Sequence, residues 1–311
     1  MTQKLAFVFP GQGSQSVGML GDLAEAHGIV RDTFAEASEA LGYDLWDVVQ
    51  NGPEATLNRT DCTQPAMLAA GVAVWRVWTE RGGEVPTLMA GHSLGEYTAL
   101  ACAQSIRFSE AVAVVADRGR YMQEAVPEGS GAMAAILGLD DEVVERVCRE
   151  AAEGEVVEAV NFNAPGQVVI AGSRSAVERA VKAAEGAGAK RAMELPVSVP
   201  SHCALMKPAA ERLAERLAGI EVFPPRIPVI HNVDVSTSAD SAEIREKLVA
   251  QLHSPVRWVG TVQRMAKEGV DRAVECGPGR VLAGLNRRID RQVATAAVHD
   301  PQSLEKALEK G

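Results

Sequence analysis

The sequence predicts an α/β protein with a large domain on a central, mainly parallel sheet and a small ferredoxin-like domain inserted into it. Three observations predict this fold class. Short apolar segments alternate with longer helix-like segments over about the first 125 residues; the order changes to βαββαβ between about 129 and 197; the alternation then resumes. We therefore expect residues 1–128 and 198–311 to form the large domain and residues 129–197 the small one.

Two strand-like segments begin the large domain, LAFVFP at 5–10 and TLMAG at 87–91. Between them, CTQPAMLAAGVAVWRVWTER at 62–81 repeats its apolar residues at helical spacing. Both strands run into glycine-containing turns, GQGSQ at 11–15 and GHSLG at 91–95. Because sites in open α/β sheets lie beyond the carboxyl ends of the strands, we expect these two turns to meet at one edge.

The inserted segment is flanked by turn-forming stretches, VPEGSG at 126–131 and PVSVPS at 196–201. Its expected elements are a strand at 131–138, a helix from Asp140, strands at 156–162 and 167–172, a helix from Ser173, and a strand at 189–196. The large domain then resumes with a strand at 227–233, a helix at 241–252, and a strand at 272–279 that ends in a glycine turn.

The composition is that of a soluble globular protein, with 47% apolar and 23% charged residues. A net charge of −10 argues against a nucleic-acid partner, because binding a polyanion requires a basic surface. The longest apolar stretches, such as EAVAVVAD at 110–117, are shorter than the roughly 20 residues that cross a bilayer. The first residues lack the features of a signal peptide, so we expect a cytoplasmic protein without a membrane partner.

The five cysteines and six histidines follow no disulfide or metal-binding pattern. No cysteines have C-x-x-C spacing and no histidines have H-E-x-x-H spacing. The turn at 11–15 lacks the third glycine of a dinucleotide-binding G-x-G-x-x-G motif. We therefore expect reduced thiols, no metal and no cofactor.

Ser93 lies at the centre of Gly-x-Ser-x-Gly, between a predicted strand and a predicted helix. This is the context of a nucleophile elbow, in which glycines permit a sharp turn and the helix N-terminus directs N–H groups at the reacting carbonyl. A serine hydroxyl is a weak nucleophile at neutral pH, so Ser93 also requires an adjacent base.

Three histidines are candidates for that base. His92 is adjacent in sequence, but neighbouring side chains at a turn usually diverge, so we expect it to be structural or to line the site. His202 lies where the inserted segment returns to the large domain, and His299 lies late in the chain, as the base of α/β-hydrolases does. The residues alone leave His202 and His299 open.

Arg118 lies in a strongly apolar segment with helical spacing, residues 109–124. An arginine in such surroundings pairs either with a carboxylate of the protein, Asp117 being near in sequence, or with a carboxylate of a ligand. The residues alone do not choose between these two roles.

Six segments together resemble one family. They are FPGQGSQ, GHSLGEY, the first arginine of VADRGRYM, NFNAPGQVVIAG, VSVPSHCALM and GPGRVL, in order along essentially the whole chain. The set is similar to the malonyl-CoA:acyl carrier protein transacylases of bacterial type II fatty acid synthesis. Acyltransferase domains of polyketide synthases share the layout, so the pathway, fatty acid or polyketide, stays open.

The resemblance implies an S-malonyltransferase that moves malonyl from coenzyme A to the phosphopantetheine thiol of acyl carrier protein through an ester on Ser93. It implies that His202 is the base and that the backbone carbonyl of Gln251 orients it, so that the Gln251 side chain matters little. The backbone N–H groups of Gln12 and Leu94 are then expected to form the oxyanion hole.

The resemblance also assigns the substrate and the partners. Arg118 is expected to bind the malonyl carboxylate and Asn163 to line the pocket. The partners are malonyl-CoA and an acidic carrier protein, and the resemblance implies a monomer. Docking of an acidic partner requires basic residues near the cleft, and the densest basic clusters contain Lys190, Arg191, Arg287 and Arg288.

Two other functions remain from the residues alone. One is an esterase that uses Ser93 with His299, and the other is a non-catalytic module that only docks a carrier protein. Replacing His202 and His299 in turn separates the first from the transferase, whereas covalent labelling of Ser93 by malonyl-CoA excludes the second.

Overall fold

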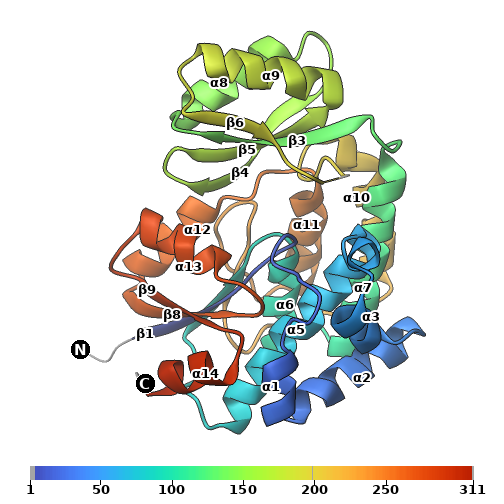
Figure 1. Cartoon of the computed structure of the whole chain (residues 1–311), viewed down its shortest axis with the longest axis vertical. Helices are drawn as coiled ribbons and strands as arrows, with labels where there is room; N and C mark the ends of the chain where they lie inside the picture. The colour runs from blue at the N-terminus through green and yellow to red at the C-terminus, as the bar shows by residue number, and fades with distance from the viewer. Residues whose placement is uncertain (1–3, 198, 310–311) are drawn as a thin grey trace.

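The computed structural model describes residues 4–197 and 199–309 and has a large lower part and a small upper part (Figure 1). The fold class predicted from the sequence is confirmed. The small part consists of one chain segment, between the end of helix α7 (Phe108–Ala125) and helix α10 (Lys207–Ala218). Residues 1–3, 198 and 310–311, at the ends of the predicted large-domain segments, lie outside the described residues.

The large part is built on a five-stranded parallel sheet in the order β7-β2-β1-β8-β9. Its strands are β1 (Lys4–Phe9), β2 (Leu88–Gly91), β7 (Val229–Ile230), β8 (Val270–Cys276) and β9 (Ala294–Val298). Alternate residues of β1 enter separate cores, Phe7 and Phe9 in one and Ala6 and Val8 in the other. Burial on both faces explains why this strand is apolar at nearly every position.

Helices cover both faces of this sheet (Figure 1). Besides α7 and α10, they are α1 (Gly21–Ala26), α2 (Ile29–Leu41), α3 (Leu45–Asn51), α4 (Glu54–Leu57), α5 (Thr60–Glu80), α6 (Leu94–Cys102), α11 (Ser241–Leu252), α12 (Trp258–Lys267), α13 (Val281–Ile289) and α14 (Pro301–Leu308). A short 3-10 turn, Ala204–Met206, precedes α10. No helix within the described ranges has the length and apolar character needed to cross a bilayer.

The small part has the βαββαβ order of a ferredoxin-like fold and an antiparallel sheet ordered β4-β5-β3-β6. Its elements are β3 (Gly131–Leu137), α8 (Asp141–Ala151), β4 (Val157–Ala164), β5 (Gln167–Ser173), α9 (Arg174–Gly186) and β6 (Arg191–Glu194). The two helices pack on one face of the sheet. The other face carries Met133, Val160 and Val169, which cluster with Cys203 beyond the insert.

Backbone hydrogen bonds join the two parts. Val256, just before α12, donates to the Val160 carbonyl at 2.8 Å and accepts from the Phe162 N–H at 3.0 Å. Val256 thereby pairs alongside β4 through an isolated parallel bridge to Asn161. The small part is therefore held against the large one by main-chain pairing as well as by side-chain contacts.

The strand predicted at 227–233 is wrong in length, because β7 comprises only two residues. After Ile230 the chain leaves the sheet, and His231 and Asn232 instead bond to the carboxylate of Glu96. A buried polar partner from another element thus ends a strand that apolar patterning alone would continue.

Candidate active site

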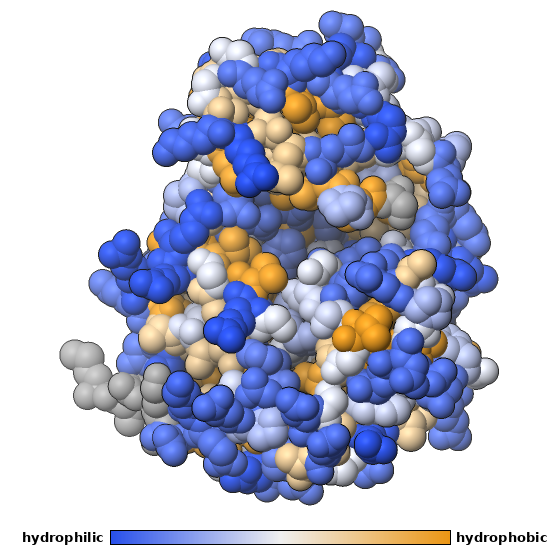
Figure 2. Space-filling model, in the orientation of Figure 1, coloured by the Kyte–Doolittle hydropathy of each residue, from blue (hydrophilic) through white to orange (hydrophobic). Residues whose placement is uncertain are grey.

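A cleft opens between the two parts at the carboxyl ends of β1 and β2, and Figure 2 shows it as a hollow in the middle of the face. It encloses about 260 Å³. Both glycine turns contribute to its floor, the small sheet contributes Met133 and Val169 to its roof, and α13 contributes Leu282 and Leu285. The expectation that the two turns meet at one edge agrees with this arrangement.

Ser93 occupies a sharp turn between β2 and α6, with φ 51° and ψ −110°. The turn is closely packed because a Cβ atom at Gly91 would lie 1.8 Å from the carbonyl carbon of Gly95. A Cβ atom at Gly95 would lie 2.0 Å from the carbonyl oxygen of Phe9. Glycine is required at both positions by close backbone approach, and Ser93 is consequently held at the edge of the cleft.

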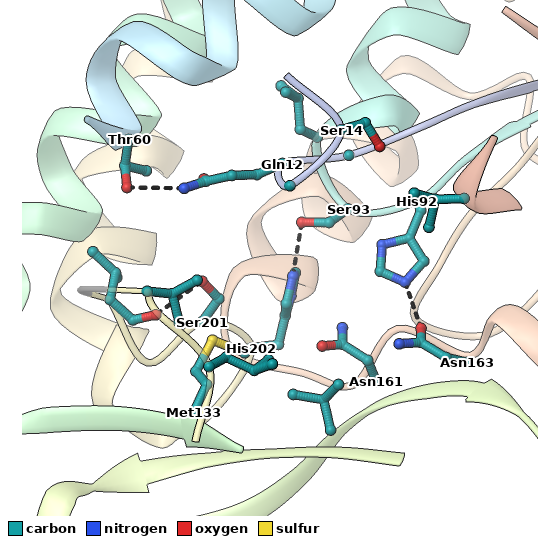
Figure 3. A pocket seen from close by; sticks show the side chains of 18 of the residues that line it. Gln12, Ser14, Thr60, His92, Ser93, Met133, Asn161, Asn163, Ser201 and His202 are labelled. Atoms are coloured by element: carbon teal, nitrogen blue, oxygen red, sulfur yellow. Dashed lines mark hydrogen bonds between the residues drawn. The ribbon is translucent and has the colours of Figure 1, made fainter. Parts of the chain in front are cut away.

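Ser93 and His202 lie within hydrogen-bond distance, 2.7 Å between Oγ and Nε2 (Figure 3). On the other side of the ring, Nδ1 of His202 lies 2.7 Å from the Gln251 carbonyl oxygen. Since a carbonyl can only accept, Nδ1 carries the proton and Nε2 presents a lone pair to the serine hydroxyl. This geometry allows the imidazole to take the hydroxyl proton during attack on a carbonyl.

Two residues that line the cleft with Ser93 have backbone N–H groups without a partner in the described part of the chain. Gln12 lies in the first glycine turn and Leu94 is the first residue of α6, and both line the cleft. Within residues 4–197 and 199–309, neither N–H has a hydrogen-bond acceptor. Two free donors that border a nucleophile can stabilise an oxyanion.

Arg118 projects from α7 into the protein and is 1% exposed. Its guanidinium donates to Gln64 Oε1 at 2.8 Å, to Gln251 Oε1 at 3.0 Å and to Ser93 Oγ at 3.3 Å. It also lies over the ring of Tyr97. No carboxylate of the described chain forms a salt bridge with it, and its Nε has no hydrogen-bond partner there. A buried guanidinium whose hydrogen-bond acceptors are all uncharged is suited to bind an anion beside Ser93.

The Gln251 side chain, which we expected to matter little, is hydrogen-bonded to three other residues. Its Oε1 accepts from Arg118, and its Nε2 donates to the Ser93 carbonyl at 3.0 Å and to Glu96 Oε2 at 2.8 Å. Sequence reasoning also missed Gln64 and Glu96. Both are polar residues within apolar helical runs, which is a signal of buried partners.

The geometry can be compared with proteins of known family. A model described as the acyl transferase domain matches residues 6–300. The chain belongs to this acyl transferase family. The malonyl CoA-acyl carrier protein transacylase of Salmonella typhimurium is 59% identical over 308 residues, covering 99% of each chain. The protein of the same name from Bacillus subtilis is 44% identical, with 98% of this chain and 96% of that one covered.

Solved structures agree with this assignment to the acyl transferases. A malonyl-transacylase in complex with a type II polyketide acyl carrier protein superposes with a TM-score of 0.98 at 59% identity, covering 99% of this chain and 100% of that one. An acyl carrier protein S-malonyltransferase from Vibrio cholerae has a TM-score of 0.96 at 58% identity, covering 98% and 99%.

His92 in this acyltransferase points away from Ser93 toward the small part. Its Nε2 lies 2.7 Å from Asn163 Oδ1, and both residues line the cleft (Figure 3). The His92 ring also lies against Trp258. Burial lowers the pKa of His92, so the ring is neutral and connects the serine turn to β4.

His299 is not near the acyltransferase cleft. It follows β9, its Nε2 lies 3.3 Å from Asp300 Oδ2, and it borders a separate hollow with α14. Of the two histidines left open by the sequence, His202 is the one that contacts Ser93. No three His, Cys, Asp or Glu side chains in the described ranges gather in a way that could hold a metal ion.

The residues of the predicted basic clusters differ in their hydrogen bonds. Lys190 and Arg191 lie exposed at the start of β6, and Arg287 is exposed on α13. Arg288 is exposed as well, but its guanidinium bonds to the Gln167 side chain and to a carbonyl in the β4–β5 turn. Arg288 therefore has a structural role in joining the two parts.

The pKa of His202 is lowered from 6.5 to about 3, first by burial and second by the Arg118 guanidinium. A lowered pKa keeps the imidazole neutral as the pH falls, so it remains able to accept a proton. We therefore expect kcat/KM for acylation of Ser93 by an acyl thioester to stay constant from about pH 8 to about pH 5.

The measurement is the rate of acyl-enzyme formation at limiting thioester, with circular dichroism at each pH to confirm folding. A rate that falls to half near pH 6.5 would show that His202 titrates like an exposed histidine, which contradicts this expectation.

Proposed function

We propose that this acyltransferase is a malonyl-CoA:acyl carrier protein transacylase that transfers malonyl through an ester on Ser93. The observation that carries the proposal is the buried Arg118 guanidinium, which lies 3.3 Å from Ser93 Oγ and has no salt bridge within the described ranges. A malonyl thioester has a carboxylate two bonds from its reacting carbonyl. An esterase of neutral substrates has no use for such a cation.

In the first half-reaction, Ser93 Oγ attacks the thioester carbonyl of malonyl-CoA while His202 Nε2 takes the hydroxyl proton. The N–H groups of Gln12 and Leu94 stabilise the negative oxygen of the tetrahedral intermediate. The C–S bond then breaks, and the leaving coenzyme A thiolate takes the proton from His202. Malonyl remains as an ester on Ser93.

In the second half-reaction, the phosphopantetheine thiol of the carrier protein gives its proton to His202 and attacks the ester carbonyl. The same two N–H groups hold the oxyanion. When the C–O bond breaks, His202 returns the proton to Ser93 Oγ, so the enzyme is restored and malonyl leaves as a thioester of the carrier.

Arg118 selects the acyl group in this proposal. Gln64 and Gln251 hold two of its nitrogens, which orients the guanidinium before substrate binds. The malonyl carboxylate then pairs with it in a site where water is largely excluded, and Asn163 lines the pocket from the small part. The proposed acceptor is the acyl carrier protein of fatty acid synthesis. A type II polyketide acyl carrier protein, which one relative binds, is the second acceptor to assay.

Intact mass spectrometry after mixing with malonyl-CoA tests the proposal. A malonyl adduct on Ser93 that disappears when phosphopantetheinylated carrier protein is added, with malonyl recovered on the carrier, is the expected result. Malonyl-CoA consumption with malonate release and no carrier loading would indicate a hydrolase instead. A protein that takes up no malonyl at all would be a docking module.

We infer a docking surface for the acidic carrier that includes the exposed Arg287 on α13, with Lys190 just before β6 and Arg191 at its start. Arg287→Glu is expected to raise KM for the carrier about tenfold, because charge complementarity governs encounter. Loading from malonyl-CoA should stay unchanged. Arg288 is left intact because it joins the two parts.

The matched control is Arg146→Glu on α8, which makes the same charge change on the outer helix layer of the small part. Steady-state transfer and single-turnover loading are measured for both variants. Equal effects of the two reversals would assign the change in KM to net charge, and equal losses in both half-reactions would exclude a docking role.

We also propose a cytoplasmic location. All five cysteines are buried and unpaired, as is usual in a reducing compartment.

A further inference from the structure

Asn232 is a buried residue after β7 that takes no part in the steps proposed above. Its side chain bonds to two backbone groups of the serine turn. Oδ1 accepts from the Ser93 N–H at 2.7 Å, and Nδ2 donates to the Gly91 carbonyl at 2.7 Å. We propose that Asn232 is a positioning residue that fixes the backbone of the nucleophile turn, an inference that rests on the proposed role of Ser93.

The turn needs such support because Ser93 has a conformation that residues with a Cβ rarely adopt, with φ 51° and ψ −110°. Such a residue costs free energy and persists only where its surroundings determine it. Asn232 bonds on both sides of His92, at the carbonyl before it and at the N–H after it. One planar amide thereby holds the peptide planes on both sides of His92, and the second of these planes leads directly into Ser93.

This contact also decides which N–H groups can receive an oxyanion. The Ser93 N–H is directed at Asn232 and is not available to substrate. The next N–H along the chain, that of Leu94, has no acceptor within the described residues. By fixing the plane before Ser93, Asn232 keeps the Leu94 donor directed at the cleft, where Gln12 supplies the second one.

Asn232 is itself firmly held. Its backbone N–H donates to Glu96 Oε2 at 3.0 Å, and its carbonyl accepts from the Arg257 N–H at 3.1 Å. The other oxygen of Glu96 lies 2.8 Å from His231 Nδ1. Glu96 and His231 are fully buried. The amide that clamps the turn is therefore anchored by a network that solvent does not reach.

The test compares Asn232→Ala with Asn286→Ala. Asn286 is also a fully buried amide with two bonds, to Trp258 Nε1 at 2.9 Å and to Thr295 Oγ1 at 3.1 Å, but it does not contact the serine turn. Single-turnover acylation by malonyl-CoA and by acetyl-CoA is measured per folded molecule. Asn232→Ala is expected to lower both rates roughly 100-fold, with little change in KM, because the nucleophile and the oxyanion donor are displaced. Asn286→Ala should keep the wild-type rates.

A folded Asn232→Ala variant whose rates lie within about threefold of those of Asn286→Ala would overturn the inference. Amide hydrogen exchange of the wild-type protein supplies a measurement that does not depend on the variant's folding. The Ser93 amide is expected to exchange at least about 100-fold more slowly than the Leu94 amide, because only the first has a buried acceptor. Equal exchange of the two would also overturn it. A wild-type protein that malonyl-CoA does not acylate would instead contradict the proposed function.

Discussion

Ser93→Ala is expected to abolish acylation by malonyl-CoA, and His202→Ala to slow it by roughly 10³-fold or more. The first change removes the attacking oxygen. The second removes the base that lies 2.7 Å from that oxygen, so the hydroxyl keeps its proton at neutral pH. Single-turnover labelling with malonyl-CoA, followed by mass spectrometry, measures both rates.

Two further variants serve as controls. His299→Ala removes the other candidate base and should load normally, since His299 contacts Asp300 and borders a different hollow. Cys203→Ala removes the thiol next to the base and should also keep most activity, because burial raises the pKa of Cys203 to about 12 and the thiol is inert. Loading of Ser93→Ala at even about a tenth of the normal rate would contradict the assignment of the nucleophile.

Arg118→Ala is expected to lower the rate of Ser93 acylation by malonyl-CoA without lowering the rate of acylation by acetyl-CoA. Without the guanidinium, the malonyl carboxylate is buried unpaired at a cost of about 3–5 kcal/mol. At roughly 1.4 kcal/mol per factor of ten, kcat/KM for malonyl-CoA falls by about 10²–10³. Acetyl-CoA has no carboxylate and should be spared or improved, because a desolvated cation is removed from its path.

The measurement is acylation of Ser93 by both thioesters in the wild-type, Arg118→Ala and Arg118→Lys proteins. Lysine should restore only part of the malonyl rate, since an ammonium cannot form the paired contacts of a guanidinium. Circular dichroism confirms that each variant is folded. Parallel losses with malonyl and acetyl would mean that Arg118 supports the fold or contacts coenzyme A, and the substrate assignment would then be withdrawn.

The fold could be predicted because its signals are local. Alternating strand and helix patterns on either side of a βαββαβ segment were sufficient for the class. Element ends were harder to predict, and β7 is the clearest example. It ends where His231 and Asn232 bond to Glu96, and the chain separation of that contact, 135 residues in the case of His231, leaves no trace in hydropathy.

The candidate site likewise contains residues that could be predicted from local sequence and residues that could not. The glycines around Ser93 mark a turn that short-range sterics require, so the motif alone indicates the nucleophile. The loop that carries His202 is positioned by the surrounding fold. Residue patterns alone therefore could not choose between His202 and His299 as the base, and the family resemblance was needed to do so. The contacts of the Gln251 side chain were not predicted because its partners Ser93 and Glu96 lie more than 150 residues away in the chain.

The bridge from β4 to Val256 has a consequence for protein engineering. A designer who wished to change acyl-chain preference by exchanging the small part between relatives would naturally cut at the two linkers. Such a graft would separate β4 from Val256, its main-chain partner, and Asn163 from His92. The segment around Val256 therefore belongs with the small part as a unit of recombination, although nearly 60 residues separate it from the insert in the chain.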